Sequence, residues 1–97
     1  MNKKAFHKYL LRKKRSPRAI MKYMQLVSEF SQYLEQSHEI KEIKKAQCFQ
    51  IEEFLFNYPK KRDVNILVYA RSILYYYERL GRPHHLSCME KVLKKLK

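Results

Sequence analysis

The sequence predicts an all-α fold, a compact bundle of four to five helices that forms one domain over residues 1–97. The chain has one Gly and three Pro, so few positions interrupt a helix. Apolar residues recur at spacings of three and four, whereas alternating, strand-like runs are no longer than a few residues. A single domain of this length buries roughly 60–65% of its unfolded surface. We therefore expect the chain to fold without cross-links.

The first helix is expected over about residues 3–13, where Phe6, Tyr9 and Leu10 form a short apolar face. The basic run Arg12–Arg15 follows and breaks the apolar pattern. We interpret this run as a connector between two helices.

A long helix is predicted from Pro17 to about Gln36. Ser16 can accept a hydrogen bond from a free backbone amide, and Pro17 suits the first helical position because its missing N–H would have no partner there. The residues that share one face, predicted to be core, are Ile20, Tyr23, Met24, Val27, Phe30, Ser31 and Leu34. The opposite side carries Arg18, Lys22, Gln25 and Glu29. This helix therefore buries one side and offers a basic end to a partner.

A third helix is expected over about residues 45–57, after a polar loop at 36–42. Its apolar residues form a wide arc that leaves little room for a wet face, so it is predicted to be the most buried element. They are Cys48, Phe49, Ile51, Phe54, Leu55 and Phe56. Tyr58-Pro59 is expected to end this helix, because the residue before a proline avoids the helical conformation. Lys60-Lys61-Arg62 then forms a second basic connector.

A fourth helix is predicted to start after Asp63 as its cap and to end at Leu80, with Gly81 as the stop. Its expected core face consists of Ile66, Tyr69, Ala70, Ile73, Tyr77 and Leu80. The residues predicted to face outward are Val64, Val68, Arg71, Tyr75, Arg79 and, past the helix, Arg82.

The last helix is expected to start at a capping box, Ser87-Cys88-Met89-Glu90, after a turn at residues 82–85. Two histidines in this turn, His84 and His85, lack a third ligand at metal-binding spacing and are interpreted as polar loop residues. No cofactor or metal is predicted.

Cysteine usage and hydropathy bear on the cellular location. Cys48 and Cys88 lie far apart and form no C-x-x-C motif, so we expect two reduced, small apolar residues of an intracellular protein. There is no long uncharged apolar run for a membrane span and no convincing secretion signal at the N-terminus. The sequence therefore predicts a cytoplasmic protein associated with a bacterial or phage nucleoid, without a membrane partner.

Positive charge is the strongest functional signal. The net charge is +13, and residues 1–22 hold nine Lys or Arg and no acid. Residues 23–57 hold three basic residues against six Glu, and residues 58–97 hold ten against three acids. Two basic ends around an acidic middle are typical of a protein with one side that faces a polyanion. Nucleic acid is the favoured partner, and a basic surface that serves only solubility is the alternative.

The candidate DNA contacts gather at the two connectors and at the outward sides of the second and fourth helices. They are Lys13, Lys14, Arg15, Ser16, Arg18, Lys22, Gln25, Lys60, Lys61, Arg62, Asn65, Arg71, Tyr75 and Arg79. Most would contact phosphate, so binding should fall steeply with salt and depend weakly on sequence. Asn65 and Gln25 have amides that can pair with adenine edges.

The tyrosine run Tyr75–Tyr77 spans about 200° of a helix, so it cannot form one stacking platform. Tyr77 is expected to be core, Tyr76 a boundary residue, and Tyr75 alone free to touch a ligand. No general base or activating cluster accompanies any of them, so we predict no enzymatic activity and no small-molecule substrate.

The order of these features resembles the N-terminal core-binding domain of tyrosine recombinases, the phage-integrase type enzymes, whose small helical domain has a SAM-like fold. The resemblance covers nearly the whole chain. The residues that carry it are Phe6, Leu10, Ser16-Pro17, Ile20, Tyr23, Phe30, Leu34, Ile43, Cys48, Leu55, Leu67, Ala70-Arg71, Ile73-Leu74 and Gly81.

The resemblance implies a module that clamps one face of the recombination site, with the start of the second helix and the outward side of the fourth at the major groove. The family often has Thr where this chain has Ala19 and Arg where it has Asn65. The catalytic domain, with its Arg, His and nucleophilic Tyr, has no counterpart in these 97 residues. A parent recombinase would be the enzyme, and other recombinase subunits are possible partners.

Two further hypotheses stay open at this point. One is a helical protein-interaction module, accessory to a recombinase, that docks another chain through exposed Val64, Val68 and Tyr75. The other is a basic RNA-binding helical protein, which direct competition between RNA and duplex DNA would identify.

Overall fold

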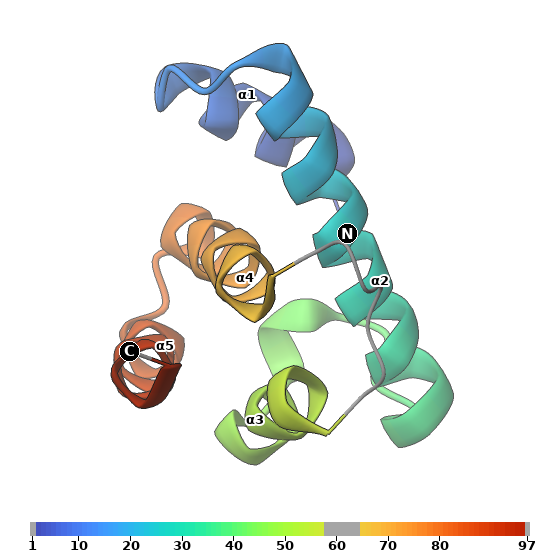
Figure 1. The fold of residues 1–97 in the computed structure, drawn as a ribbon. Helices are drawn as coiled ribbons and strands as arrows, with labels where there is room; N and C mark the ends of the chain where they lie inside the picture. The colour runs from blue at the N-terminus through green and yellow to red at the C-terminus, as the bar shows by residue number, and fades with distance from the viewer. Residues whose placement is uncertain (1, 58–64, 97) are drawn as a thin grey trace.

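The computed structural model describes residues 2–57 and 65–96, and all regular structure within them is helical. The elements are α1 (Lys3–Arg12), α2 (Pro17–His38), the short 3-10 helix η1 (Ile43–Lys45), α3 (Cys48–Phe56), α4 (Ile66–Leu80) and α5 (Pro83–Leu96). They form one globule of 30 × 27 × 25 Å, shown in Figure 1. The prediction of an all-α bundle is confirmed.

Local capping explains where the helices begin and end. The amide of Ala19 donates to the Ser16 hydroxyl at 3.2 Å, and Pro17 is the first residue of α2, as predicted. Gly81 ends α4 in the left-handed conformation, at φ 64°. The cap of α4 is Asn65, whose side-chain oxygen accepts from the amide of Leu67 at 2.8 Å. Asp63, predicted to be this cap, lies outside the described residues.

α4 is the central helix of the bundle, and it packs against α1, α2, α3 and α5, as Figure 1 shows. Its predicted core residues Tyr69, Ala70, Ile73 and Tyr77 are buried. The structure also buries Tyr75, which was predicted to face outward, together with Ser72 and with Tyr76, which was expected as a boundary residue. That part of the prediction is wrong because α1 and α2 cover a second side of α4. Phe6 of α1 packs edge-on against Tyr76, with ring centroids 5.2 Å apart.

The buried face of α2 is rotated relative to the predicted one. Ile20, Val27, Phe30 and Leu34 are buried as expected, whereas Tyr23, Met24 and Ser31 are only partly buried. Leu26 and Tyr33 are buried in their place. The reason is that α3 and α4 pack along the Leu26–Tyr33 side of the helix. There the Tyr33 hydroxyl donates to the carboxylate of Glu53 on α3 at 2.5 Å.

α3 is shorter and more exposed to solvent than predicted. It buries Ile51, Phe54 and Leu55, but Phe49 and Phe56 are 56% and 45% exposed. The prediction that this helix is the most buried element is therefore wrong. Its neighbours cover only the side that carries Ile51 and Phe54, so the two phenylalanines on the opposite side face solvent.

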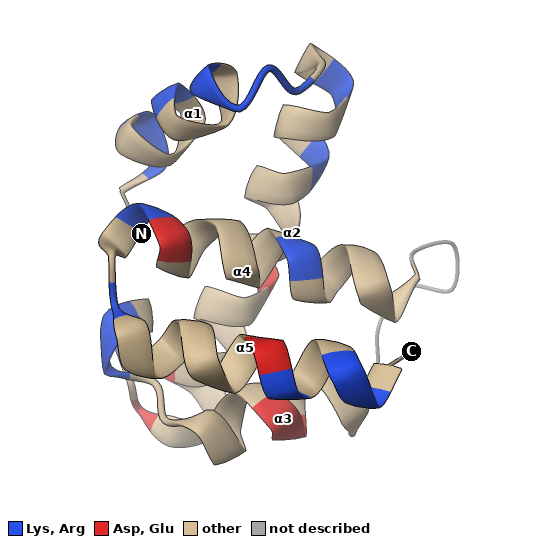
Figure 2. Cartoon of the chain, turned by 90° about the vertical axis from the view of Figure 1, so that its left-hand side faces the viewer, with Lys and Arg blue, Asp and Glu red and all other residues tan. Residues whose placement is uncertain are grey.

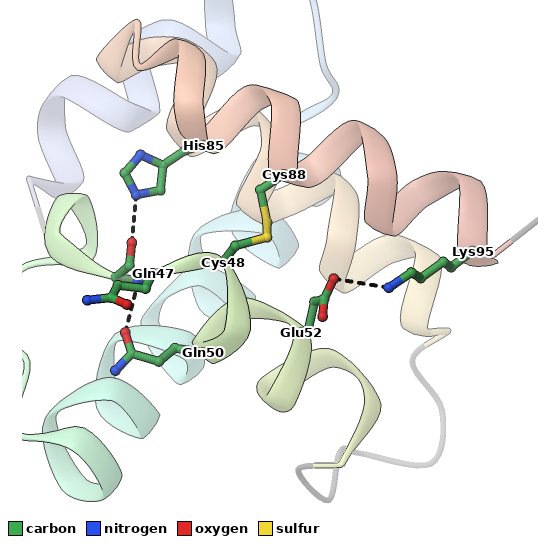
Figure 3. The surroundings of a disulfide bond; sticks show 8 residues. Gln47, Cys48, Gln50, Glu52, His85, Cys88 and Lys95 are labelled. Atoms are coloured by element: carbon green, nitrogen blue, oxygen red, sulfur yellow. Dashed lines mark hydrogen bonds and ion pairs between the residues drawn. A yellow bond between two sulfur atoms is a disulfide. The ribbon is translucent and has the colours of Figure 1, made fainter.

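A disulfide between Cys48 and Cys88 joins the first turn of α3 to α5, as Figure 3 shows. The sequence separation is 40 residues, and the Cα atoms lie 5.8 Å apart. The expectation of two reduced cysteines is contradicted. Hydrophobic packing of α5 on α3 and α4 brings two distant cysteines together, and no local spacing in the sequence indicates this contact.

His85 is a structural residue of α5 and not part of a loop. The helix begins at Pro83, four residues before the predicted Ser87 cap, because proline suits a first helical position. His85 is 6% exposed, and its ring stacks on Tyr77 with centroids 4.3 Å apart. Its Nε2 donates to the carbonyl of Ala46 at 2.7 Å (Figure 3). The opposite ring nitrogen, Nδ1, is buried and has no hydrogen-bond partner among the described residues.

Acidification should destabilise the fold through His85. Burial lowers the pKa of this ring below its usual value, and the hydrogen bond to Ala46 offsets only part of that effect. The unfolded chain therefore binds the proton more tightly than the folded one. The contribution of neutral His85 to the free energy of unfolding is fully present above the pKa of the unfolded state, about 6.5. It is lost as the pH falls through the lower pKa of the folded state. We expect the free energy of unfolding, measured by urea titration, to decline between about pH 7 and 5.

Two variants separate this contribution from other titrating groups. His85→Gln keeps a donor for Ala46 but cannot take up the proton, so its free energy of unfolding should vary less over this pH range. His84→Gln changes an exposed neighbour and should behave like the wild type. Equal pH dependence in all three proteins would show that His85 does not titrate as described.

Candidate nucleic-acid interface

The connector between α1 and α2 is a sharp turn with a defined conformation. Lys14 adopts a left-handed backbone, with φ 58°. The amide of Lys14 donates to the carbonyl of Leu11, and that of Arg15 to the carbonyl of Leu10. These bonds satisfy carbonyls at the end of α1 and reverse the chain. The turn places the guanidinium carbon of Arg15 5.4 Å from the ring centre of Tyr75 on α4.

Lys13 is held by an acid, which distinguishes it from the other cations of the connector. Its Nζ lies 3.3 Å from the carboxylate of Glu78 on α4, and the Tyr9 hydroxyl donates to the same carboxylate at 2.6 Å. The hydrogen bond and charge of Glu78 raise the pKa of Lys13. Local pairing therefore uses the charge of Lys13, whereas Lys14 and Arg15 are exposed and have no acid partner among the described residues.

The first half of α2 presents a row of exposed or half-exposed side chains. Arg18 and Gln25 are exposed and Lys22 is partly exposed. Ser16, predicted as a DNA contact, uses its hydroxyl to cap the helix. Along the row runs an open hollow of about 610 Å³. Among the described residues it is lined by Pro17, Arg18, Met21, Lys22 and Gln25.

Met21 is the residue of this surface that the sequence analysis missed. Its side chain is 74% exposed, the largest value among the described large hydrophobic residues. It lies three residues after Arg18 and four before Gln25, so it belongs to the same helical row. That spacing is visible in the sequence and places Met21 outside the predicted core face.

Tyr75 is not a free ligand-binding side chain. It is 9% exposed, and its ring packs edge-on against Tyr23 of α2 with centroids 5.4 Å apart. Lys13 and Arg15 approach the same ring at 5.8 and 5.4 Å. The prediction of an exposed Tyr75 is therefore wrong, because the α1–α2 turn covers it. Its role in this structure is to hold the connector and α2 against α4.

Arg71 and Arg79 belong to different surroundings. Arg71 is exposed one helical turn before Tyr75, so it lies on the side of α4 that faces the connector and the start of α2. Arg79 lies two turns further on, with its guanidinium carbon 5.5 Å from the ring centre of Tyr76. Its Nε is buried without a hydrogen-bond partner among the described residues. Arg79 also lines a hollow with Asn2 and Lys44, and it is not brought together with Arg71.

Four predicted DNA contacts remain, and the structure describes one of them, Asn65. Asn65 is exposed, but its side-chain oxygen caps α4. That bond occupies the acceptor that a pairing with adenine would need. Lys60, Lys61 and Arg62 lie outside the described residues.

Residues 1–22, which form α1, the connector and the start of α2, carry positive charge without any acid. Figure 2 shows blue Lys and Arg positions on α1, on the connector and along the first half of α2, with a further blue position midway along α4. Red positions lie on α3 at the bottom of this view, and also on α4 and α5, where blue positions adjoin them. The connector and the first half of α2 thus present exposed Lys14, Arg15 and Arg18 and partly exposed Lys22. We call this surface the cationic face and count Arg71 as part of it.

The described residues contain no cluster of three or more His, Cys, Asp or Glu side chains that could hold a metal ion. Among the same residues, no helix is both long enough and apolar enough to cross a membrane.

The fold and its surface define the class of protein only broadly, as a small, strongly basic helical bundle. The chain matches no protein-family model, no curated protein and no solved structure. Its function must therefore be inferred from the chemistry of the cationic face.

Proposed function

We propose that this protein binds double-stranded DNA through the cationic face, as the core-binding module of a tyrosine recombinase or integrase does when it clamps one side of a recombination site. The proposal depends on one observation: α4 packs against the connector and the start of α2, although these segments are distant in sequence. Tyr75 of α4 contacts both Tyr23 of α2 and Arg15 of the connector. We infer from this that Arg71, one turn away from Tyr75, lies on the same side of the molecule as Arg18 and Lys22, where a duplex would meet both helices at once.

The electrostatics support a duplex as the partner. Nine cations and no acids in residues 1–22 create a field that attracts a polyanion and speeds encounter. Arg side chains suit phosphate because their planar donors match its oxygens. Gln25, exposed in the same row as Arg18, can reach base edges once phosphate contacts have set the register.

Replacing two arginines should test the face directly. In Arg18→Ala/Arg71→Ala, duplex affinity at about 0.1 M salt should fall at least tenfold, or ~1.4 kcal/mol. The slope of log K against log salt should become shallower by about 2 units, because two phosphate contacts are lost. Fluorescence anisotropy with a labelled duplex measures both quantities, and circular dichroism verifies that helicity is kept.

The matched control is Lys91→Ala/Lys94→Ala on α5, which removes the same charge. Both lysines are exposed, and α5 packs on α3 and α4 rather than on α2. The affinity of this lysine variant for duplex DNA should change much less than that of the arginine variant. Equal losses in the two double variants would mean that binding follows net charge and not this face. Stronger binding to RNA than to duplex DNA in direct competition would favour the RNA-binding alternative.

In the cytoplasmic, nucleoid-associated location that we propose, the cross-link between Cys48 and Cys88 would be reduced. Disulfides persist in oxidising compartments, and the cytosol keeps thiols reduced. The cysteines lie on α3 and α5, away from the cationic face. We therefore expect duplex affinity to be the same with and without reductant, at temperatures where both forms are folded.

A further inference from the structure

The exposed side of α3 carries an aromatic strip. Phe49 and Phe56 are seven residues apart, so they lie on one side of the helix, two turns apart. They are 56% and 45% exposed. Single exposed hydrophobic residues are ordinary, whereas contiguous exposed apolar surface marks a site of interaction. We call this side of α3 the aromatic strip.

Two carboxylates flank the strip and are held in place. Glu52 and Glu53 follow Phe49 by three and four residues, so one lies on each side of the line between the phenylalanines. Glu52 pairs with Lys95 of α5 at 3.2 Å (Figure 3). Glu53 accepts from the Tyr33 hydroxyl at 2.5 Å and lies 3.4 Å from His38. Their side chains remain 33% and 43% exposed. Lys95 offsets the charge of Glu52, whereas Glu53 has no Lys or Arg partner among the described residues and can meet a basic partner.

The complementary surface occurs on the same chain. Met21 on α2 is 74% exposed and lines the 610 Å³ hollow together with the side chains of Arg18 and Lys22. The aromatic strip is apolar with a carboxylate on each flank, of which only Glu52 is paired with a lysine, and this hollow is apolar with positive flanks. Each surface thus has the apolar character and the opposite charge that the other requires.

We propose that the aromatic strip docks into the α2 hollow of a second copy of this chain, in a head-to-tail contact. A phenylalanine would cover Met21 while Glu52 and Glu53 approach Arg18 and Lys22. A symmetric contact between two aromatic strips would bring four carboxylates together, and one between two hollows would do the same with cations. Like charges at close range oppose both symmetric arrangements. Only the head-to-tail pairing satisfies charge and apolar character together.

Such a contact is weak and open-ended. Each copy carries a net charge of +13, so long-range repulsion opposes it until ionic strength of about 0.15 M screens charges beyond ~8 Å. A head-to-tail dimer keeps one free strip and one free hollow, which permits further addition. The proposal does not depend on duplex binding, although both use Arg18 and Lys22.

Sedimentation velocity on the full chain at about 0.15 M ionic strength tests the proposal. The wild type should show a sedimentation coefficient that rises with concentration beyond that of a dimer. Phe49→Gln/Phe56→Gln removes the strip, and Met21→Glu adds a negative charge to the hollow. Each variant alone should sediment as a monomer. A mixture of the two should form a dimer and nothing larger, because only one intact strip and one intact hollow remain.

Leu11→Gln is the matched control, since Leu11 is 51% exposed but belongs to neither surface. It should associate like the wild type. A wild type that stays monomeric at all concentrations would overturn the proposal, as would a mixture that fails to form a dimer. Association of Phe49→Gln/Phe56→Gln on its own would do so too, because it would assign the contact to another surface. The substituted residues are exposed, and unchanged circular dichroism verifies folding.

Discussion

Removing the cross-link in Cys48→Ala/Cys88→Ala should lower the free energy of unfolding by about 4 kcal/mol at 25 °C. The estimate follows from chain entropy, because a link across about 40 residues restricts the unfolded chain by ~13 cal/mol/K. The sequence separation of 40 residues is that of the disulfide observed. Urea denaturation in the absence of reductant measures the difference. On a domain of 97 residues, a loss of this size is a large part of the total stability, roughly 5–15 kcal/mol.

Reductant provides the control. Wild-type protein should lose a similar amount of stability when it is reduced, whereas the double alanine variant should be insensitive to reductant. A wild-type unfolding midpoint that does not move on reduction would show that the cysteines are not linked in solution. The other contacts between this part of the chain and α5, from Glu52 to Lys95 and from Ala46 to His85, remain in both forms. They are expected to keep α5 in place at low temperature.

Truncating Phe54 should cost about 3–5 kcal/mol of unfolding free energy, the range for a fully buried phenylalanine. Phe54 has 0% exposure. Its ring lies 5.0 Å from that of Phe30, 5.2 Å from that of Tyr33 and 5.9 Å from that of Tyr69, centroid to centroid. Phe54→Ala therefore leaves a cavity where α2, α3 and α4 meet. Urea denaturation at neutral pH measures the loss.

Phe56→Ala is the matched control, because it makes the same substitution two residues later on the same helix. Phe56 is 45% exposed, so its truncation should cost less than about 1 kcal/mol. Comparable losses in the two variants would contradict the orientation of α3, and with it the exposure of the aromatic strip.

The sequence predicts those features of the fold that depend on neighbouring residues. Ser16 and Pro17 define the start of α2 because capping is a local interaction, and Gly81 ends α4 for the same reason. The positions of α1 and α4 follow from their apolar periodicity. These features were confirmed.

Features that depend on which elements meet in space were not predictable in this way. Periodicity assigns α4 one buried side, but α4 is central and has neighbours on several sides, so Tyr75 is buried as well. Cys48 and Cys88 lack any local signal for pairing. The sequence around His85 likewise gives no sign of its hydrogen bond to the carbonyl of Ala46, which is 39 residues away.

For the candidate site, the sequence identified the charged residues but not their separate roles. The cations of the connector and the start of α2 are exposed as expected, except that Glu78 holds Lys13. That pairing joins residues 65 positions apart and needs the packing of α1 on α4. Arg79 was predicted together with Arg71 because the helical periodicity puts both on the outward side of one helix. In the structure Arg79, eight positions after Arg71, lies against Tyr76 instead.

The most direct test of the cationic face is the effect of a DNA duplex on the backbone amide resonances of the ¹⁵N-labelled protein. Chemical shifts should change for Lys14 and Arg15, for the first half of α2, and around Arg71, while those of α3 and of the second half of α5 stay constant. Changes centred on α3 or α5, with Arg18 and Arg71 unaffected, would contradict the proposed interface.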